Sequence, residues 1–126
     1  MLAGQYAISK LPPRTPLPVW AATKQDEFSS FTRTSDELSI VCPEGRVPPE
    51  VNTSRGWVGL RLIGPFAFSE IGVLSSFLHP LAEHGIGVFA ISTFDTDYLL
   101  IEARFWDRAS KVLRAAGHEE VPHQTR

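Results

Sequence analysis

The stretch from Gly87 to Ala103, GVFAISTFDTDYLLIEA, holds the side chains of this chain that are best suited to ligand chemistry. Two apolar runs flank the joint FDTD, which places the carboxylates of Asp95 and Asp97 next to the hydroxyl of Thr96. One interpretation is turn chemistry, because Asp and Thr side chains satisfy nearby backbone groups and keep a hairpin tip hydrated. We favour it for Asp95. The other interpretation, favoured for Asp97, is a rim carboxylate that binds a cationic group.

Catalytic and metal chemistry finds little support elsewhere in the chain. The four histidines, His79, His84, His118 and His123, show no ligand spacing with an acidic partner, and Cys42 lies in an apolar strand that suits an inert buried thiol. The sequence contains no Gly-rich phosphate loop, no G-x-S-x-G elbow and no H-E-x-x-H motif. We therefore predict no catalytic residue, no metal site and no cofactor, and that the chain is not an enzyme.

Length and composition limit the remaining classes of protein. The chain has 126 residues, enough for one compact domain or two very small ones that share a core. Hydrophobic residues make up 43% and charged residues 21%, which is typical of a folded protein. The net charge of -2, with the signs interspersed, argues against a nucleic-acid partner. No stretch is long and apolar enough for a membrane span or a signal peptide, so we expect a cytoplasmic protein without a membrane partner.

The first half reads as short strands separated by proline-rich segments. GQYAISKL, from Gly4 to Leu11, alternates as a strand, with Tyr6 and Ile8 on one side. One or two helical turns are possible from residue 18 to residue 23. EFSSFTRT and DELSIVC read as a hairpin, and the proline- and glycine-containing stretch 43–54 reads as a linker.

The second half has clearer signals. WVGLRLIG is a strand, and apolar positions at helical spacing predict a helix from Ser69 to His84 that Gly85 ends. Ser69 is the expected N-cap, and Glu70 would face the positive end of the helix dipole. IGVFAIST and DYLLIEA are the strands around the FDTD joint, and FWDRASKVLRAAG is a second amphipathic helix.

The two halves resemble each other in sequence. FSSFTRTSDELSI, from Phe28, aligns without gaps with FAISTFDTDYLLI, from Phe89, at an offset of 61 residues that places Asp36 on Asp97. The first copy is shorter in its helix region. An internal repeat of this size predicts two small modules that share a core.

The run VGLRLIGPFAFSEIGVLSSFLHPLAEHGIGVFAISTFDTDYLLI resembles an ACT domain, a small amino-acid-sensing regulatory module. The paired arrangement is similar to the regulatory modules of aspartate kinases and of the arginine-sensing CASTOR proteins. The resemblance implies an α+β, ferredoxin-like βαββαβ sandwich, with an antiparallel sheet and helices on one face. It divides the chain into a degenerate, shortened module (1–50), a second ACT-like module (55–120) and a tail (121–126).

The resemblance also implies where a ligand would bind. ACT domains commonly hold an amino acid where the loop between the first strand and the helix meets another module. The helix N-terminus would present N–H groups of Glu70, Ile71 and Gly72 to a carboxylate, and Asp97 would accept the ammonium group. The expected ligand-binding residues are Pro65, Phe66, Ser69, Glu70, Ile71, Gly72, Thr96 and Asp97.

The loop before the helix departs from the family pattern because it carries two aromatic residues. The loop GPFAFSE carries Phe66 and Phe68, which either narrow the pocket over an apolar ligand side chain or fill the site as a contact between modules.

We predict a non-catalytic sensor that binds a free amino acid, forms a homodimer and acts on a separate regulated protein. The alternative is a dimerisation or interaction module with no ligand.

Overall fold

The computed structural model describes residues 1–25, 27–63 and 72–120. The elements in these parts are β1 (Tyr6–Leu11), η1 (Val19–Ala21), β2 (Ser30–Arg33), β3 (Leu38–Pro43), η2 (Glu44–Arg46), β4 (Thr53–Arg61), α1 (Val73–Glu83), β5 (Phe89–Ser92), β6 (Asp97–Glu102), η3 (Ala103–Phe105) and α2 (Trp106–Ala115), where η marks a 3-10 turn. The second half therefore follows the predicted order of strand, helix, strand, strand and helix. No helix of the described residues has the length and apolar character needed to cross a membrane.

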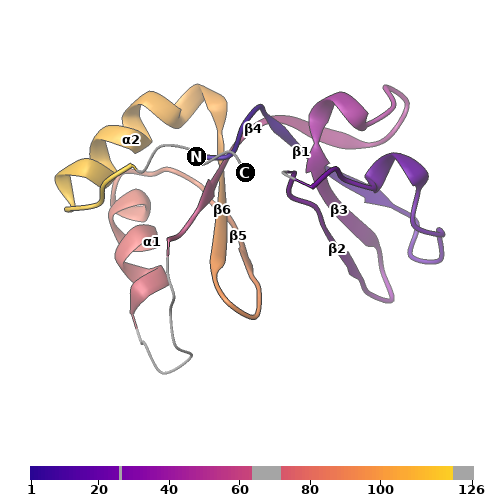
Figure 1. The fold of residues 1–126 in the computed structure, drawn as a ribbon, viewed down its shortest axis with the longest axis horizontal. Coiled ribbons are helices and arrows are strands. Elements are labelled where there is room, and N and C mark those ends of the chain that lie inside the picture. Colours follow the sequence, from indigo (N-terminus) through magenta and orange to yellow (C-terminus); the bar gives the residue numbers. More distant parts are fainter. Residues whose placement is uncertain (26, 64–71, 121–126) are drawn as a thin grey trace.

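All six strands form one antiparallel sheet in the order β2-β3-β1-β4-β6-β5 (Figure 1). Each half contributes three strands, and the halves join where β1 pairs with β4. The βαββαβ pattern has one strand more per module than either half shows among the described residues. Because β1 and β4 lie side by side, each half covers the free edge of the other half's first strand.

Strand β4 begins earlier than the sequence predicted. It starts at Thr53, inside the stretch 43–54 that was expected to be a linker, and it needs no apolar pattern there because β1 supplies its backbone partners. Ser9 lies opposite Thr53, and their hydroxyl oxygens are 3.0 Å apart. The ladder with β1 ends with Tyr6 opposite Trp57, so the rest of β4 extends beyond the joint.

The two helices cover one face of the second half, as predicted. α1 and α2 lie next to each other (Figure 1) and pack on apolar side chains of β4 and β6. The buried residues of this cluster are Leu60, Leu62, Leu81, Ile86, Leu99, Ile101, Ala109, Val112 and Leu113. In the first half, the turn η1 takes the place of a helix, and Ala21 packs there against Leu38, Ile40 and Cys42. The first module is therefore the shortened one.

The opposite face of the sheet curls inward between the halves and carries a third cluster. Tyr6 and Val41 of the first half pack there with Leu100 of the second half. Phe28 bridges the halves, because its ring stacks on that of Tyr98 with centroids 4.2 Å apart. The Phe28 backbone N–H also donates a hydrogen bond of 3.0 Å to the Tyr6 hydroxyl. We call this side the inner face and the helix-covered side the outer face.

The start of α1 differs from the prediction. The helix begins at Val73, and its N-cap position is Gly72, not Ser69. The physical reason is the backbone of Gly72, whose φ of 90° is left-handed and cannot continue a right-handed helix towards the N-terminus. Ser69 itself lies outside the described residues.

Candidate functional site

The threonines of the β5–β6 turn carry out turn chemistry. The Thr93 N–H donates to Thr96 O at 2.8 Å, and the Thr96 N–H donates to Thr93 Oγ1 at 3.2 Å. The β2–β3 turn uses the same device, since the Glu37 N–H donates to Thr34 Oγ1 at 3.1 Å. The hydroxyls of Thr93 and Thr34 therefore stabilise the two hairpins, as the first interpretation of the FDTD joint proposed.

The two hairpins also correct the sequence alignment. In the structure Leu38 starts β3 opposite Arg33, and Asp97 starts β6 opposite Ser92. The corresponding offset is 59 residues, Leu38 onto Asp97, and not the 61 that paired Asp36 with Asp97. A shift of two residues keeps every side chain on its own face, which is why the apolar pattern alone could not exclude it. Only the second hairpin has a carboxylate at the first position of its second strand.

Asp97 lies half-buried at that position, whereas Asp95 is exposed at the turn. Asp97 Oδ1 accepts a hydrogen bond of 2.5 Å from Ser92 Oγ, which holds the carboxylate at the rim of the sheet. Thr96 Oγ1 donates to Leu62 O at 2.6 Å, and the Leu62 N–H donates to Asp97 O at 3.0 Å. The turn is thereby tied to the end of β4.

The N-terminus of α1 lies at the same end of the sheet as this turn (Figure 1). No side chain caps the helix there among the described residues, so the first N–H groups of α1, those of Val73, Leu74 and Ser75, have no capping acceptor. Gly72, Thr96 and Asp97 are therefore grouped at one end of the second half. The other predicted ligand residues, Pro65, Phe66, Ser69, Glu70 and Ile71, lie outside the described residues, as does Phe68.

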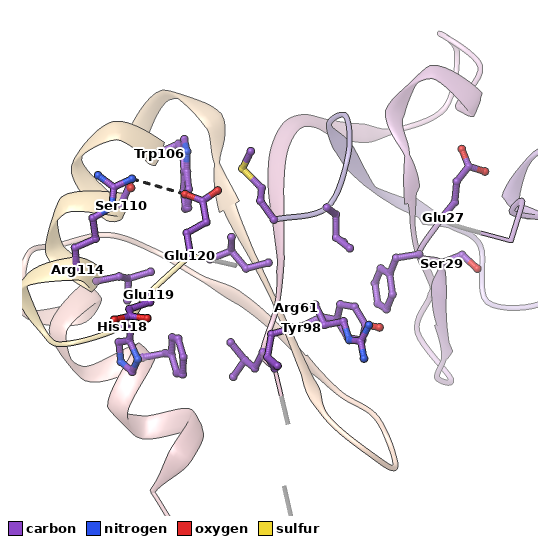
Figure 2. A pocket seen from close by; sticks show the side chains of 18 of the residues that line it. Glu27, Ser29, Arg61, Tyr98, Trp106, Ser110, Arg114, His118, Glu119 and Glu120 are labelled. Carbon is purple, nitrogen blue, oxygen red and sulfur yellow. Dashed lines mark ion pairs between the residues drawn. The ribbon is translucent and has the colours of Figure 1, made fainter. Parts of the chain in front are cut away.

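A cleft of about 980 Å³ lies between the two halves (Figure 2). It surrounds the part of β4 that extends beyond β1, and residues from both faces of the sheet line it. Arg61, Tyr98 and Phe28 come from the inner face, and Phe77 and Trp106 come from the helices of the outer face. None of the three described residues that the sequence predicted for the site lines this cleft.

Some charged side chains that line the cleft form ion pairs, and Arg61 does not among the described residues. Arg114 and Glu120 form an ion pair with an N–O distance of 3.7 Å, and Glu27 pairs with Arg46 at 2.6 Å. A hydrogen bond from the Lys24 backbone N–H, together with Arg46, lowers the pKa of the Glu27 carboxyl. The guanidinium of Arg61 is exposed and has no hydrogen bond or ion pair with any other described residue.

Sequence reasoning did not identify the cleft. Its residues come from segments that are far apart in the chain, and no local motif connects them. One signal was present, because Arg61 places a cation between Leu60 and Leu62 in the otherwise apolar stretch WVGLRLIG. Metal binding has no support in the described part of the chain, which contains no group of three or more His, Cys, Asp or Glu side chains arranged for an ion.

Comparison with family models divides the chain in two. The model of the ACT domain matches residues 52–115. A second model, for an N-terminal domain, matches residues 4–50.

Solved structures provide an independent comparison. A crystal structure of a protein from Agobacterium tumefaciens is 40% identical, with a TM-score of 0.87 over 98% of this chain and 92% of that chain. A Vibrio cholerae protein of unknown function, described as a possible transport protein, is 18% identical, with a TM-score of 0.69 over 92% of this chain and 86% of that one. The ligand-free regulatory subunit of aspartate kinase from Thermus thermophilus is 10% identical, with a TM-score of 0.63 over 94% of this chain and 97% of that subunit.

The last two likenesses concern the fold alone, and they agree with the α+β architecture of a curled antiparallel sheet with two helices. The ACT model covers the half of the chain that contains both helices and the FDTD joint. This protein belongs to the ACT domain family.

Proposed function

We propose that this protein is a non-catalytic regulatory sensor that binds a free amino acid where β4 ends and α1 begins. The observation that supports the proposal most directly is the tie between Thr96, Asp97 and Leu62, because it holds a rim carboxylate beside the end of β4. The fold shared with the regulatory subunit of an aspartate kinase agrees with this function.

The two charged groups of an amino acid find matching chemistry in this region. The N-terminus of α1, which no described side chain caps, offers N–H groups and a partial positive charge to the α-carboxylate. Asp97 offers a carboxylate to the α-ammonium group. Residues 64–71 connect these two parts along the chain, and we assign Pro65, Phe66, Ser69, Glu70 and Ile71 to the same site.

The output of such a sensor would be a change in geometry between modules or between protomers. A ligand shifts that geometry only if it binds one arrangement more tightly than another. We propose a homodimer that acts on a separate regulated protein.

A thermal-shift screen against the twenty amino acids tests this function. We expect one amino acid or one small class to raise the melting temperature, since a ligand at about 100 times its dissociation constant adds roughly 2.7 kcal/mol to stability. Asp97→Asn keeps a hydrogen-bond acceptor for Ser92 but removes the charge, so it should abolish the shift without unfolding the protein. Asp95→Asn, in the same turn, is the matched control and should preserve the shift.

Two results would count against the sensor. One is the absence of a shift with all twenty amino acids, and the other is a shift that Asp97→Asn leaves unchanged. Either result would favour an interaction module without a ligand at this end of the sheet. Light scattering with and without the effective amino acid measures whether the protein is a dimer and whether the ligand changes that state.

A further inference from the structure

We propose that the cleft between the two halves is a second binding site, which takes a small organic acid with one carboxylate and a flat apolar body. The carboxylate would bind at Arg61, and the body would lie against aromatic side chains that line the cleft. This site is separate from the amino-acid site proposed at Asp97, which does not line the cleft.

Arg61 supplies the charge that the site needs. It lies at the end of β4 opposite Tyr98, on the inner face, while its neighbours Leu60 and Leu62 point to the outer core. Its guanidinium faces the cleft (Figure 2) and has no partner among the other described residues. A planar guanidinium fork matches a carboxylate with two parallel hydrogen bonds, which makes a carboxylate the natural complement.

The walls of the cleft favour an apolar, flat ligand body. Trp106 and Phe77 line the cleft from α2 and α1, and the stacked rings of Phe28 and Tyr98 line it from the inner face. Stacked and edge-to-face contacts with such rings stabilise a planar group beyond simple area burial. The cleft volume of about 980 Å³ is sufficient for a small molecule, since ligand sites typically span roughly 300–1,000 Å³.

The backbone of β4 adds a second polar contact. The ladder with β1 ends at Trp57, and beyond it the Leu2 N–H donates to Gly59 O at 2.8 Å. Backbone groups two residues apart in a strand point the same way, so the N–H and C=O of Arg61 face the cleft side as well. β6 pairs with Arg61 on the other edge of β4, and on this edge no described strand pairs with it. A hydroxyl, keto or amide group of the ligand could bind there.

The acidic residues at the other rim limit the ligand to a single carboxylate. Glu119 and Glu120 line the cleft from the segment after α2. Glu120 already pairs with Arg114, as the dashed line in Figure 2 marks, so Arg114 does not provide a second free cation. A second carboxylate on the ligand would face these like charges.

Titration calorimetry with 3-phenylpropanoate, benzoate and 4-methylpentanoate tests the proposal on the full chain. We expect saturable binding of at least one of the two aromatic acids, weaker binding of the non-planar 4-methylpentanoate, and no binding of 3-phenylpropanol, which keeps the body but lacks the charge. Arg61→Gln should weaken binding at least tenfold, and Arg61→Lys should restore part of it. The matched control is Arg14→Gln, another exposed arginine without a partner among the described residues, which does not line the cleft and should bind as the wild type does.

Two-dimensional NMR of the same titration locates the site. Chemical-shift changes should centre on the indole N–H of Trp106 and on the amides of Arg61 and Tyr98. Asp97→Asn should leave this binding unchanged, so failure of the amino-acid sensor and failure of this site can be told apart. No saturable binding of either aromatic acid, equal binding by Arg61→Gln, or shifts centred on Gly72 would each overturn the proposal.

Discussion

Tyr6 shows how one side chain can hold the two halves together. It is 1% exposed, packs with Val41 and Leu100 on the inner face, and accepts a hydrogen bond from the Phe28 backbone N–H. Because burial disfavours the phenolate, the pKa of Tyr6 is raised above its usual value of about 10. The residue therefore contributes both packing and a pH-dependent term to stability.

We predict that Tyr6→Phe costs about 1–3 kcal/mol near pH 8, because it leaves the Phe28 N–H without its acceptor. Above about pH 10, unfolded tyrosine releases a proton that folded Tyr6 retains, so the free energy of unfolding falls as pH rises. Urea unfolding at pH 8 and pH 10.5 should show a smaller loss in Tyr6→Phe than in the wild type. Burial also raises the pKa of Cys42, but both proteins share that residue. An equal loss of stability between pH 8 and pH 10.5 in the two proteins would show that Tyr6 is not the source of the pH dependence.

The residues in and next to the FDTD joint divide between structure and proposed function. Thr93 and Thr96 satisfy backbone groups of the turn and of β4, so their types are explained by the hairpin alone. Asp97 needs more explanation, since the corresponding position of the first hairpin is Leu38, a buried apolar residue. The charge at that position is therefore not a requirement of this hairpin geometry.

At the scale of elements, the start of α1 depends on one glycine. Gly72 has a φ of 90°, and a Cβ added there would meet no atom of the other described residues within 4 Å. With respect to the described residues, the cost of a side chain at this position is therefore backbone strain and not a steric clash.

Gly72→Ala should lower the free energy of unfolding by about 1–2 kcal/mol, because L-residues are strained in the left-handed region. The matched control is Gly87→Ala, whose added Cβ likewise meets no described atom within 4 Å but which lacks a positive φ, and it should change stability by less than about 0.5 kcal/mol. Urea unfolding measures both. If α1 continued in right-handed form through residue 72, Gly72→Ala would instead stabilise the protein by up to about 1 kcal/mol.

At the scale of the whole molecule, the two halves form one sheet and should unfold together. The β1–β4 ladder, the inner cluster and the Phe28–Tyr98 stack all cross between the halves. Small domains that share a core in this way typically unfold in a single transition.

Native-state hydrogen exchange tests this cooperativity. The amides of Ile40 and Leu99, in the interior strands β3 and β6 next to the two edge strands, should exchange with the same free energy and the same urea dependence. Phe28→Ala, which removes the bridge between the halves, should lower both values equally, whereas Leu17→Ala, at an exposed side chain outside the clusters, should lower neither. Exchange of Ile40 at a lower free energy than Leu99 would show that the first half opens alone.

Sequence patterns were sufficient for most elements of the second half. Helical spacing in FWDRASKVLRAAG predicted α2, and the two apolar runs that flank the FDTD joint predicted β5 and β6. The start of β4 was missed, since Thr53 enters the sheet only through its partner strand β1. The offset of the repeat alignment was wrong by two residues, because a pattern of period two is unchanged by a shift of two residues.

By itself, the sequence determined the local elements, the ACT family resemblance and the presence of a carboxylate at the first position of β6. These properties depend on spacing within short stretches of the chain, where burial and turn chemistry leave a readable pattern. Only the tertiary structure decided that β1 pairs with β4, that α1 starts after Gly72, and that Arg61 lies in a cleft with Phe28 and Trp106. Strand edges offer the same backbone groups to many partners, so the choice among them is made by packing of the whole chain.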